Sequence, residues 1–176
     1  MLIEQIDTLS GIATAFSDFA KMPQAAKEEF DLLSLVLQVV SLFQQSPDHH
    51  VGFHSDLTGP QRIHADRGQF TRLINNLLKN AIQSIPDDQE GRVEVSLMKK
   101  GHRYIIEVKD DGEGIPESMR DRIFQPNFTT KSTGTGLGLA MCKNIVHQAE
   151  GEIWFQTQEG QGTSFFVSLP VPDDSQ

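Results

Sequence analysis

Hydrophobic and polar residues repeat along this chain with two periods, one typical of helices and one of strands. Apolar residues at helical spacing predict a helix from the N-cap Asp31 to about Gln45, and another from Asp66 to the stop at Pro86. A third helix is predicted after a glycine-rich turn that ends at Gly138. Alternating segments predict strands at 51–57, 63–65, 92–99, 102–109, 151–157 and 163–169. We expect an α+β fold, a two-layer α/β sandwich with three helices on one face of a mixed sheet of about five strands.

One predicted strand has an apolar row that finishes in a carboxylate. Its buried face carries Tyr104, Ile106, Val108 and Asp110. A carboxylate in that place is costly unless it has a dedicated donor, and the exocyclic amino group of a purine would be one. Gly112 and Gly114, which follow, permit positive φ and let a flat ligand approach the backbone. A solvated aspartate that opens an ordinary turn is the alternative.

The segment 132–142, STGTGLGLAMC, predicts a glycine-rich turn that opens a helix with an apolar side at Leu137, Met141, Ile145 and Val146. The unpaired N–H groups and partial positive charge of a helix N-terminus suit a di- or triphosphate. The turn lacks the Gly-Lys-Ser/Thr ending of a P-loop and does not follow a strand. It is therefore neither a Walker A motif nor a Rossmann fingerprint.

The helix LINNLLKNAIQSI carries two asparagines on one face. Asn76 and Asn80 are four residues apart, beside an apolar stripe formed by Leu73, Leu77, Ala81 and Ile85. Asparagine is a poor residue for a helix interior, and its amide oxygen suits Mg²⁺, which also binds nucleotide phosphates. Two exposed or capping amides are the alternative.

Composition narrows the function classes. The 176 residues carry a net charge of −9, which argues against a nucleic-acid or anionic-membrane surface. The single cysteine, Cys142, excludes an internal disulfide and fits a reducing compartment, with a buried thiol as the default interpretation. No apolar run approaches the roughly 20 residues that span a bilayer. These features favour a cytoplasmic location.

In order and spacing, four segments resemble the Asn-containing box, the first glycine box, the Phe-containing box and the second glycine box of the GHKL ATPases, and specifically those of sensor histidine kinases. They are LINNLLKNAIQSI, KDDGEGIP, IFQPNFTTK and STGTGLGLAMC. The resemblance extends from Phe30 to Pro170 and implies a Bergerat-type ATP-binding fold that binds ATP and Mg²⁺.

The resemblance also implies roles for individual residues. Asn80 would bind Mg²⁺, Asp110 would recognise adenine, and Lys131 would reach the terminal phosphates. The adenine-side loop would contain Gly112 and Gly114; the phosphate-side loop would contain Gly134, Gly136, Leu137 and Gly138. Phe124 and Phe128 would anchor a lid over 117–133, and Thr163 would support the adenine pocket from the last strand.

Position 76 separates the branches of this superfamily. Gyrase-like and MutL-like members carry a Glu there, four residues before the Mg²⁺ asparagine, to activate water. The neutral amide of Asn76 cannot accept a proton, so we expect a kinase, with Asn76 in the catalytic site together with Asn80 and Lys131. A GHKL hydrolase or clamp, or a degenerate nucleotide-binding interaction module, remains open.

Residues 1–23 form a predicted separate unit before the ATP-binding domain at 28–171 and a tail at 172–176. Apolar residues in a heptad-like seam (Leu2, Ile6, Leu9, Ala13, Phe16 and Ala20) resemble the second helix of a dimerisation and phosphotransfer hairpin, of the nitrogen-regulation type. A helix folded onto its own domain is the alternative. None of the six histidines has the context of a phosphoacceptor. We therefore expect a fragment that does not autophosphorylate alone. The acceptor histidine would lie on a hairpin absent from this chain. The full-length kinase would be a homodimer that other segments could attach to a membrane, and its partner would be a response regulator.

Overall fold

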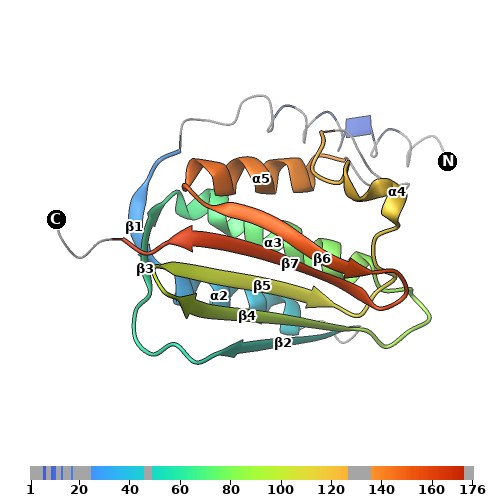
Figure 1. The fold of residues 1–176 in the computed structure, drawn as a ribbon, viewed down its shortest axis with the longest axis horizontal. Helices are drawn as coiled ribbons and strands as arrows, with labels where there is room; N and C mark the ends of the chain where they lie inside the picture. Colours follow the sequence, from blue (N-terminus) through green and yellow to red (C-terminus); the bar gives the residue numbers. More distant parts are fainter. Residues whose placement is uncertain are drawn as a thin grey trace.

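The main sheet has five strands in the order β2-β4-β5-β7-β6. The computed structural model describes residues 6, 9, 10, 13, 17, 25–45, 49–126 and 136–172. Strand β2 pairs with β4 in parallel and the other neighbours pair antiparallel, so the sheet is mixed as predicted (Figure 1). The strands are β2 (His50–Ser55), β4 (Arg92–Lys100), β5 (Arg103–Asp110), β6 (Glu152–Gln158) and β7 (Gly162–Pro170).

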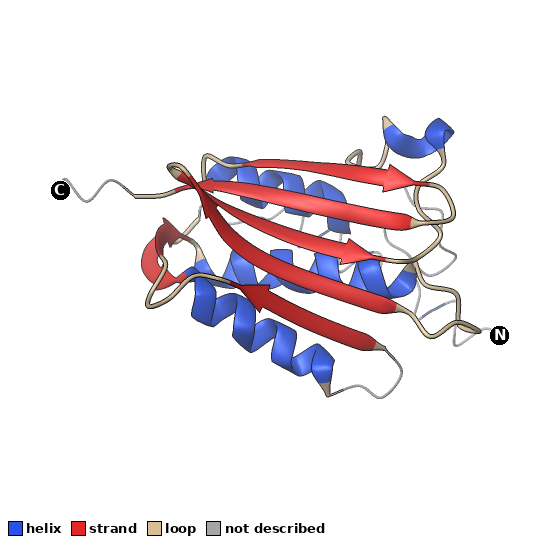
Figure 2. Ribbon diagram, turned by 60° about the horizontal axis from the view of Figure 1, so that its bottom comes forward, coloured by secondary structure: helices blue, strands red, loops and turns tan. Residues whose placement is uncertain are grey.

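Three helices cover one face of this sheet, and no described helix lies on the other face (Figures 1 and 2). They are α2 (Leu32–Gln44), α3 (Arg67–Gln83) and α5 (Gly138–Gln148). The predicted N-caps are confirmed, because the carboxylate of Asp31 accepts from the N–H of Leu33 at 3.2 Å and that of Asp66 accepts from the N–H of Gln69 at 3.0 Å. The position of the three helices on one face of the sheet confirms the predicted two-layer sandwich. A single helical turn, α4 (Glu117–Arg120), lies beyond the sheet edge.

A second, two-stranded sheet was not predicted. Strand β1 (Glu28–Asp31) pairs antiparallel with β3 (Arg62–Ala65), and Phe30 lies opposite Ile63. The segment 28–31 has one apolar side chain and three acidic ones, so no alternation marks it as a strand. Tertiary pairing alone decides its conformation. The predicted strand at 63–65 exists, but it belongs to this small sheet.

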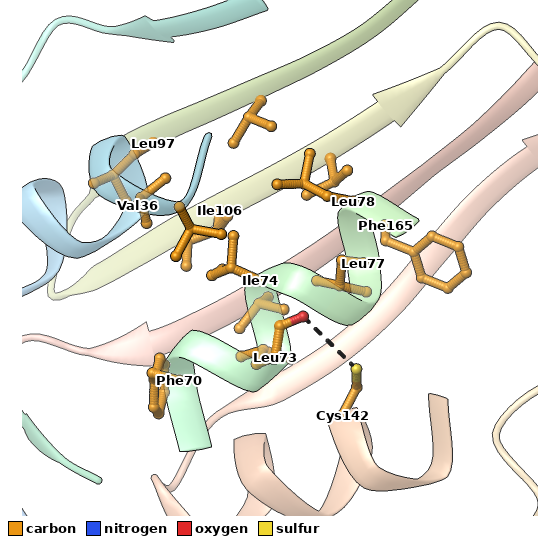
Figure 3. Packing of buried hydrophobic residues seen from close by; sticks show 14 of the residues in the cluster. Val36, Phe70, Leu73, Ile74, Leu77, Leu78, Leu97, Ile106, Cys142 and Phe165 are labelled. Atoms are coloured by element: carbon orange, nitrogen blue, oxygen red, sulfur yellow. Dashed lines mark hydrogen bonds between the residues drawn. The ribbon is translucent and has the colours of Figure 1, made fainter. Parts of the chain in front are cut away.

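The hydrophobic core lies between the sheet and the helices, with α3 at its centre (Figure 3). The α3 side chains Leu73, Ile74, Leu77 and Leu78 are completely buried. Cys142 of α5 is also buried, and its thiol lies 3.9 Å from the carbonyl oxygen of Leu73. Burial raises the pKa of this thiol to about 12, which confirms the prediction of a structural cysteine.

Most of the predicted helix over 1–21 lies outside the described residues. Its described members (Ile6, Leu9, Ser10, Ala13 and Ser17) have helical backbone. The side chains of Ile6 and Leu9 are 57% and 66% exposed. Across the part of the chain that the structure describes, no helix combines the length and apolar character needed to cross a membrane.

Candidate nucleotide-binding site

On the sheet face that meets the helices, three neighbouring strands each carry a row of apolar side chains. Each row has a polar side chain at the same end of the sheet. The row of β5 ends at Asp110, that of β7 begins at Thr163, and that of β6 ends at Thr157. Strand register places Asp110 opposite Thr163 and Thr163 opposite Thr157. Figure 1 shows the end of β5, the β6–β7 turn, α4 and the start of α5 at this same end of the molecule. The fold therefore gathers polar groups from distant segments at the edge of an apolar core.

Asp110 is buried, with 3% of its surface exposed. Its Oδ1 accepts hydrogen bonds from the backbone N–H of Gly112 at 3.0 Å and of Thr163 at 3.2 Å. Burial raises the pKa of this carboxyl above its ordinary value, although hydrogen bonds from Ser84, Gly112 and Thr163 partly offset that effect. Both backbone donors use the same oxygen, Oδ1.

The loop after Asp110 packs against the end of α3 and against the β6–β7 turn. A Cβ at Gly112 would lie 2.2 Å from the hydroxyl oxygen of Ser84, so this glycine is required by close approach. Gly114 has a φ of +74°, and a Cβ there would lie 2.4 Å from the carbonyl oxygen of Gln158. Between them, the N–H of Glu113 donates to the Ser84 carbonyl oxygen at 3.0 Å. The two glycines thus let the loop fit tightly between neighbouring segments.

A hydroxyl network holds the far end of this loop. The hydroxyl oxygen of Thr157 accepts from the N–H of Ile115 at 2.9 Å, and the Thr157 and Thr163 hydroxyl oxygens are 2.9 Å apart. Thr157 also donates to the carbonyl oxygen of Gly162 at 3.1 Å. The predicted pocket residue Thr163 is therefore next to Asp110, and Thr157 links it to the loop.

Helix α3 connects this loop to the start of α5. The amide nitrogen of Asn76 lies 3.8 Å from the sulfur of Met141 in α5, and the amide oxygen lies 3.7 Å from the position that a Cβ would take at Gly138. Asn80 follows one turn later on α3, and Ser84 follows one turn after that. At 1.5 Å per residue, the eight residues from Asn76 to Ser84 span about 12 Å.

The first turn of α5 has no side-chain cap. Its N-cap residue, Leu137, is a buried apolar residue and makes no capping hydrogen bond through its side chain. Gly136, just before it, has a φ of +68°. The N–H groups of a helix N-terminus suit an anion in general. Of the predicted phosphate-side loop, Gly136, Leu137 and Gly138 are described, whereas Gly134 lies outside the described residues.

The predicted lid is described in part. The ring of Phe124 lies over the inner face of the sheet, with centroids 6.1 Å from Phe155 and 6.3 Å from Phe165. The amino group of Lys143 in α5 lies 5.9 Å from the centroid of the Phe124 ring. This packing fits the predicted anchoring role of Phe124. The other two lid residues, Phe128 and Lys131, lie outside the described residues, so their roles stay predictions.

Sequence reasoning missed Ser84 and Thr157. A signal existed for Thr157, because the inward row of β6 (Ile153, Phe155, Thr157) ends in a polar residue just as that of β5 ends in Asp110. Ser84 gave no such signal, since it follows the end of a helix, where serine is common. Its contact with the Asp110 loop arises only from the way α3 packs beside β5.

The structure thus brings Asp110, Thr163 and the start of α5 to one end of the sheet, with Asn76 of α3 beside α5. Fold and site together define a nucleotide-binding domain. Residues 65–173 match the histidine kinase-, DNA gyrase B- and HSP90-like ATPase family, and this chain belongs to that family.

Similar proteins are sensor histidine kinases. Sensor histidine kinase ZraS of Escherichia coli (strain K12) is 37% identical over 174 residues, which are 97% of this chain and 37% of ZraS. Nitrogen regulation protein NtrY of Azorhizobium caulinodans is 32% identical over 96% of this chain and 22% of NtrY. The chain thus spans less than two fifths of the length of these two curated relatives.

Solved structures of one histidine kinase, ThkA, share the fold. The ThkA catalytic domain is 31% identical, with a TM-score of 0.72 over 82% of this chain and 95% of that domain. ThkA in complex with the response regulator protein TrrA has a TM-score of 0.79 at 25% identity, over 99% of this chain and 50% of ThkA. The predicted resemblance to histidine kinase catalytic domains is confirmed.

Proposed function

We propose that this chain is the ATP-binding catalytic domain of a sensor histidine kinase, which transfers the γ-phosphoryl group of Mg·ATP to a histidine on a separate helical hairpin. The observation that carries the choice of kinase over hydrolase is the neutral amide of Asn76. It occupies the α3 face that meets the start of α5, where a hydrolase needs a base for water.

The described residues fit an adenine nucleotide. Asp110 has one oxygen committed to backbone donors and a raised pKa, so an amino donor from a base would relieve the cost of its burial. Gly112 and Gly114 let the loop pack directly against Ser84 and Gln158, which holds its backbone beside Asp110. The uncapped start of α5 would accept the phosphates.

Asn80 would hold Mg²⁺ through its amide oxygen. Among the described residues there is no cluster of three or more His, Cys, Asp or Glu side chains that could form a protein cage for a metal ion. This fits a Mg²⁺ ion that keeps most of its ligands as water and phosphate oxygens. Bound Mg²⁺ would neutralise charge on the transferred phosphoryl group.

The chain's own residues would act mainly by positioning. Asp110 and Thr163 would orient the base, the α5 N–H groups and Lys131 would orient the phosphates, and Phe124 with Phe128 would fasten the lid. A correctly held phosphoryl group next to an acceptor histidine needs little further chemistry from the domain. Asn76 would contact the site without activating water, which preserves the γ-phosphoryl group for transfer.

Calorimetric binding of Mg·ATP to wild type, Asp110→Asn and Asn80→Ala, with ATP hydrolysis followed in parallel, tests this proposal. We expect binding by wild type, its loss in Asp110→Asn, weaker Mg²⁺-dependent binding in Asn80→Ala, and almost no turnover. Binding that is indifferent to Asn80 and to Mg²⁺ would favour a degenerate interaction module. Brisk turnover by wild type would favour a hydrolase.

A substitution that restores a base sharpens the test of Asn76. Asn76→Glu should raise ATP hydrolysis, whereas the neutral Asn76→Gln should leave it near zero. Phosphotransfer to a separately produced histidine-bearing hairpin should be retained in the Gln variant. If Asn76→Glu and Asn76→Gln hydrolyse ATP equally slowly while both bind it, the argument from position 76 is wrong.

The partners follow from the same proposal. ThkA, whose structure includes a response regulator, supports a response regulator as the partner of the full-length kinase, and the heptad seam of residues 1–23 supports a homodimer. We place residues 1–23 in the dimerisation hairpin, 28–171 in the catalytic domain and 172–176 in a tail. A cytoplasmic location follows, because the domain needs ATP.

A further inference from the structure

Two threonine hydroxyls form a pair at the β6–β7 end of the sheet. Thr157 and Thr163 lie opposite each other in the strand register, and their hydroxyl oxygens are 2.9 Å apart. Thr163 is buried, and its backbone N–H donates to Asp110 Oδ1. The hydroxyl of Thr163 is therefore beside the carboxylate, while Thr157 is one strand further away.

The directions in which the Thr157 and Thr163 hydroxyl protons point follow from counting the hydrogen-bond donors and acceptors around Thr157. Thr157 has one proton and two lone pairs. One lone pair accepts a hydrogen bond from the Ile115 N–H, and the hydroxyl proton can be donated to the Gly162 carbonyl oxygen at 3.1 Å. If Thr157 instead donated to Thr163, its bond to Gly162 would be lost. All three bonds exist together only when Thr163 donates to Thr157.

This arrangement fixes the character of Thr163 toward a ligand. Because its proton points toward Thr157, its oxygen presents acceptor lone pairs beside the carboxylate of Asp110. Two neighbouring acceptors suit a donor such as the amino group of a 6-aminopurine and disfavour the carbonyl oxygen of a 6-oxopurine.

We propose that Thr157 is a specificity-determining positioning residue, which accepts the hydrogen bond of the Thr163 hydroxyl so that the pocket selects a 6-aminopurine over a 6-oxopurine. The inference rests on the proposed function, because it requires a purine nucleotide at Asp110. It adds a residue that touches no part of the nucleotide and acts through Thr163.

The test compares ADP with inosine diphosphate by calorimetry on wild type, Thr157→Val and Thr157→Ser. Valine keeps the shape but removes the acceptor, so the Thr163 proton becomes free to reach a 6-oxo group. We expect the preference for ADP to fall about fivefold in Thr157→Val, the equivalent of about 1 kcal/mol for one hydrogen bond. Thr157→Ser should keep the wild-type preference.

The ratio of the two dissociation constants separates this role from a structural one. Thr157→Val also removes the acceptor of the Ile115 N–H, and a loosened loop would weaken both nucleotides equally without changing their ratio. Thr71→Val is the matched control, because the Thr71 hydroxyl bonds to a helix carbonyl, that of Arg67, on α3. It should leave both constants unchanged.

A second variant keeps the test independent of the folding of Thr157→Val. Thr163→Val should itself lower the preference for ADP, and adding Thr157→Val should then change the ratio no further. An unchanged ratio in Thr163→Val, or in a folded Thr157→Val, would overturn the inference while leaving the proposed function intact. Failure of wild type to bind either nucleotide would overturn both.

Discussion

At the residue scale, Asp110 is held where its charge is costly to the fold. Its carboxyl is buried at the end of an apolar row, and burial raises its pKa. A carboxyl whose folded pKa is raised favours the fold most when it is protonated, at pH values below its unfolded pKa. That contribution is lost as the pH rises through the folded pKa.

Asp110→Asn should separate binding from stability. The amide can still accept from Gly112 and Thr163, but it carries no buried charge. We expect nucleotide affinity to fall at least about a hundredfold, since a donor replaces an acceptor, while the melting temperature at pH 7 stays the same or rises. Differential scanning calorimetry with and without ADP checks both expectations. A melting temperature several degrees lower would show that the charge stabilises the fold.

The pH dependence of binding should report the same group. A 6-aminopurine needs the ionised carboxylate, so ADP affinity should hold at neutral pH and fall as the pH drops through the raised pKa of Asp110. The fall should begin at a higher pH than for an ordinary aspartate. Inosine diphosphate offers an opposite control, because a protonated Asp110 can donate to its 6-oxo group. Parallel losses for both nucleotides would point to a different titrating group.

At the element scale, the β6–β7 hairpin closes the site because its turn fits against the end of β5. Gly162 has a φ of +109°, and a Cβ there would lie 2.0 Å from the carbonyl oxygen of Asp110. Gly160, two residues earlier in the same turn, has a φ of +76° with open space around it. Both glycines have a positive φ, but only at Gly162 would a Cβ also collide with a neighbouring strand.

Replacing these two glycines by alanine, one at a time, should therefore destabilise the domain to different extents. Gly160→Ala should cost about 1 kcal/mol, the conformational penalty alone. Gly162→Ala should cost about 2 kcal/mol or more and should weaken ADP binding, because Asp110 must move. Urea denaturation followed by circular dichroism gives the first quantity and calorimetry the second. Equal losses of stability would mean that the backbone at Asp110 yields easily.

Helix α3 lies in the core and contacts both the Asp110 loop and α5. Leu77 on α3 is completely buried in the core (Figure 3), whereas Leu42 on α2 is 61% exposed. Leu77→Ala should lower the free energy of unfolding by about 2–5 kcal/mol. The matched Leu42→Ala should change it by less than about 0.5 kcal/mol. A small effect at Leu77 would show that α3 can repack around the lost volume.

At the scale of the whole molecule, the candidate site lies where four segments that are far apart in the chain come together. The end of α3, the end of β5, the β6–β7 hairpin and the start of α5 all contribute. The linker before the sandwich is also tied to it, because the N–H of Ala26 donates to Asp66 Oδ2 at 2.9 Å. Asp66 thus caps α3 and fastens residues 25–27 at once.

A chain reduced to residues 25–172 should keep the fold and the site. It retains the sandwich, the small sheet and the Ala26 to Asp66 hydrogen bond, so its melting temperature should stay within a few degrees of the full chain. ADP affinity should be unchanged. A large loss of stability would show that residues 1–24 pack on the domain, which is the alternative interpretation of the N-terminal helix.

The amino-acid sequence by itself determined the main elements and pointed to most of the candidate site residues. The period of the apolar residues defined the main helices and strands, and the N-caps Asp31 and Asp66 marked two helix starts, because these signals are local. Asp110 was found because a carboxylate ends an apolar row. The roles of Lys131, Phe128 and Gly134, by contrast, rest on family resemblance.

Only the tertiary structure decided which elements meet. Strand β1 has no pattern of its own and exists because it pairs with β3, while Ser84 and Thr157 gain importance only beside the Asp110 loop. Such contacts join residues tens of positions apart, and their geometry depends on how helices and strands pack. Local patterns carry no information about that packing, so the network that orients Thr163 could be recognised only in the folded chain.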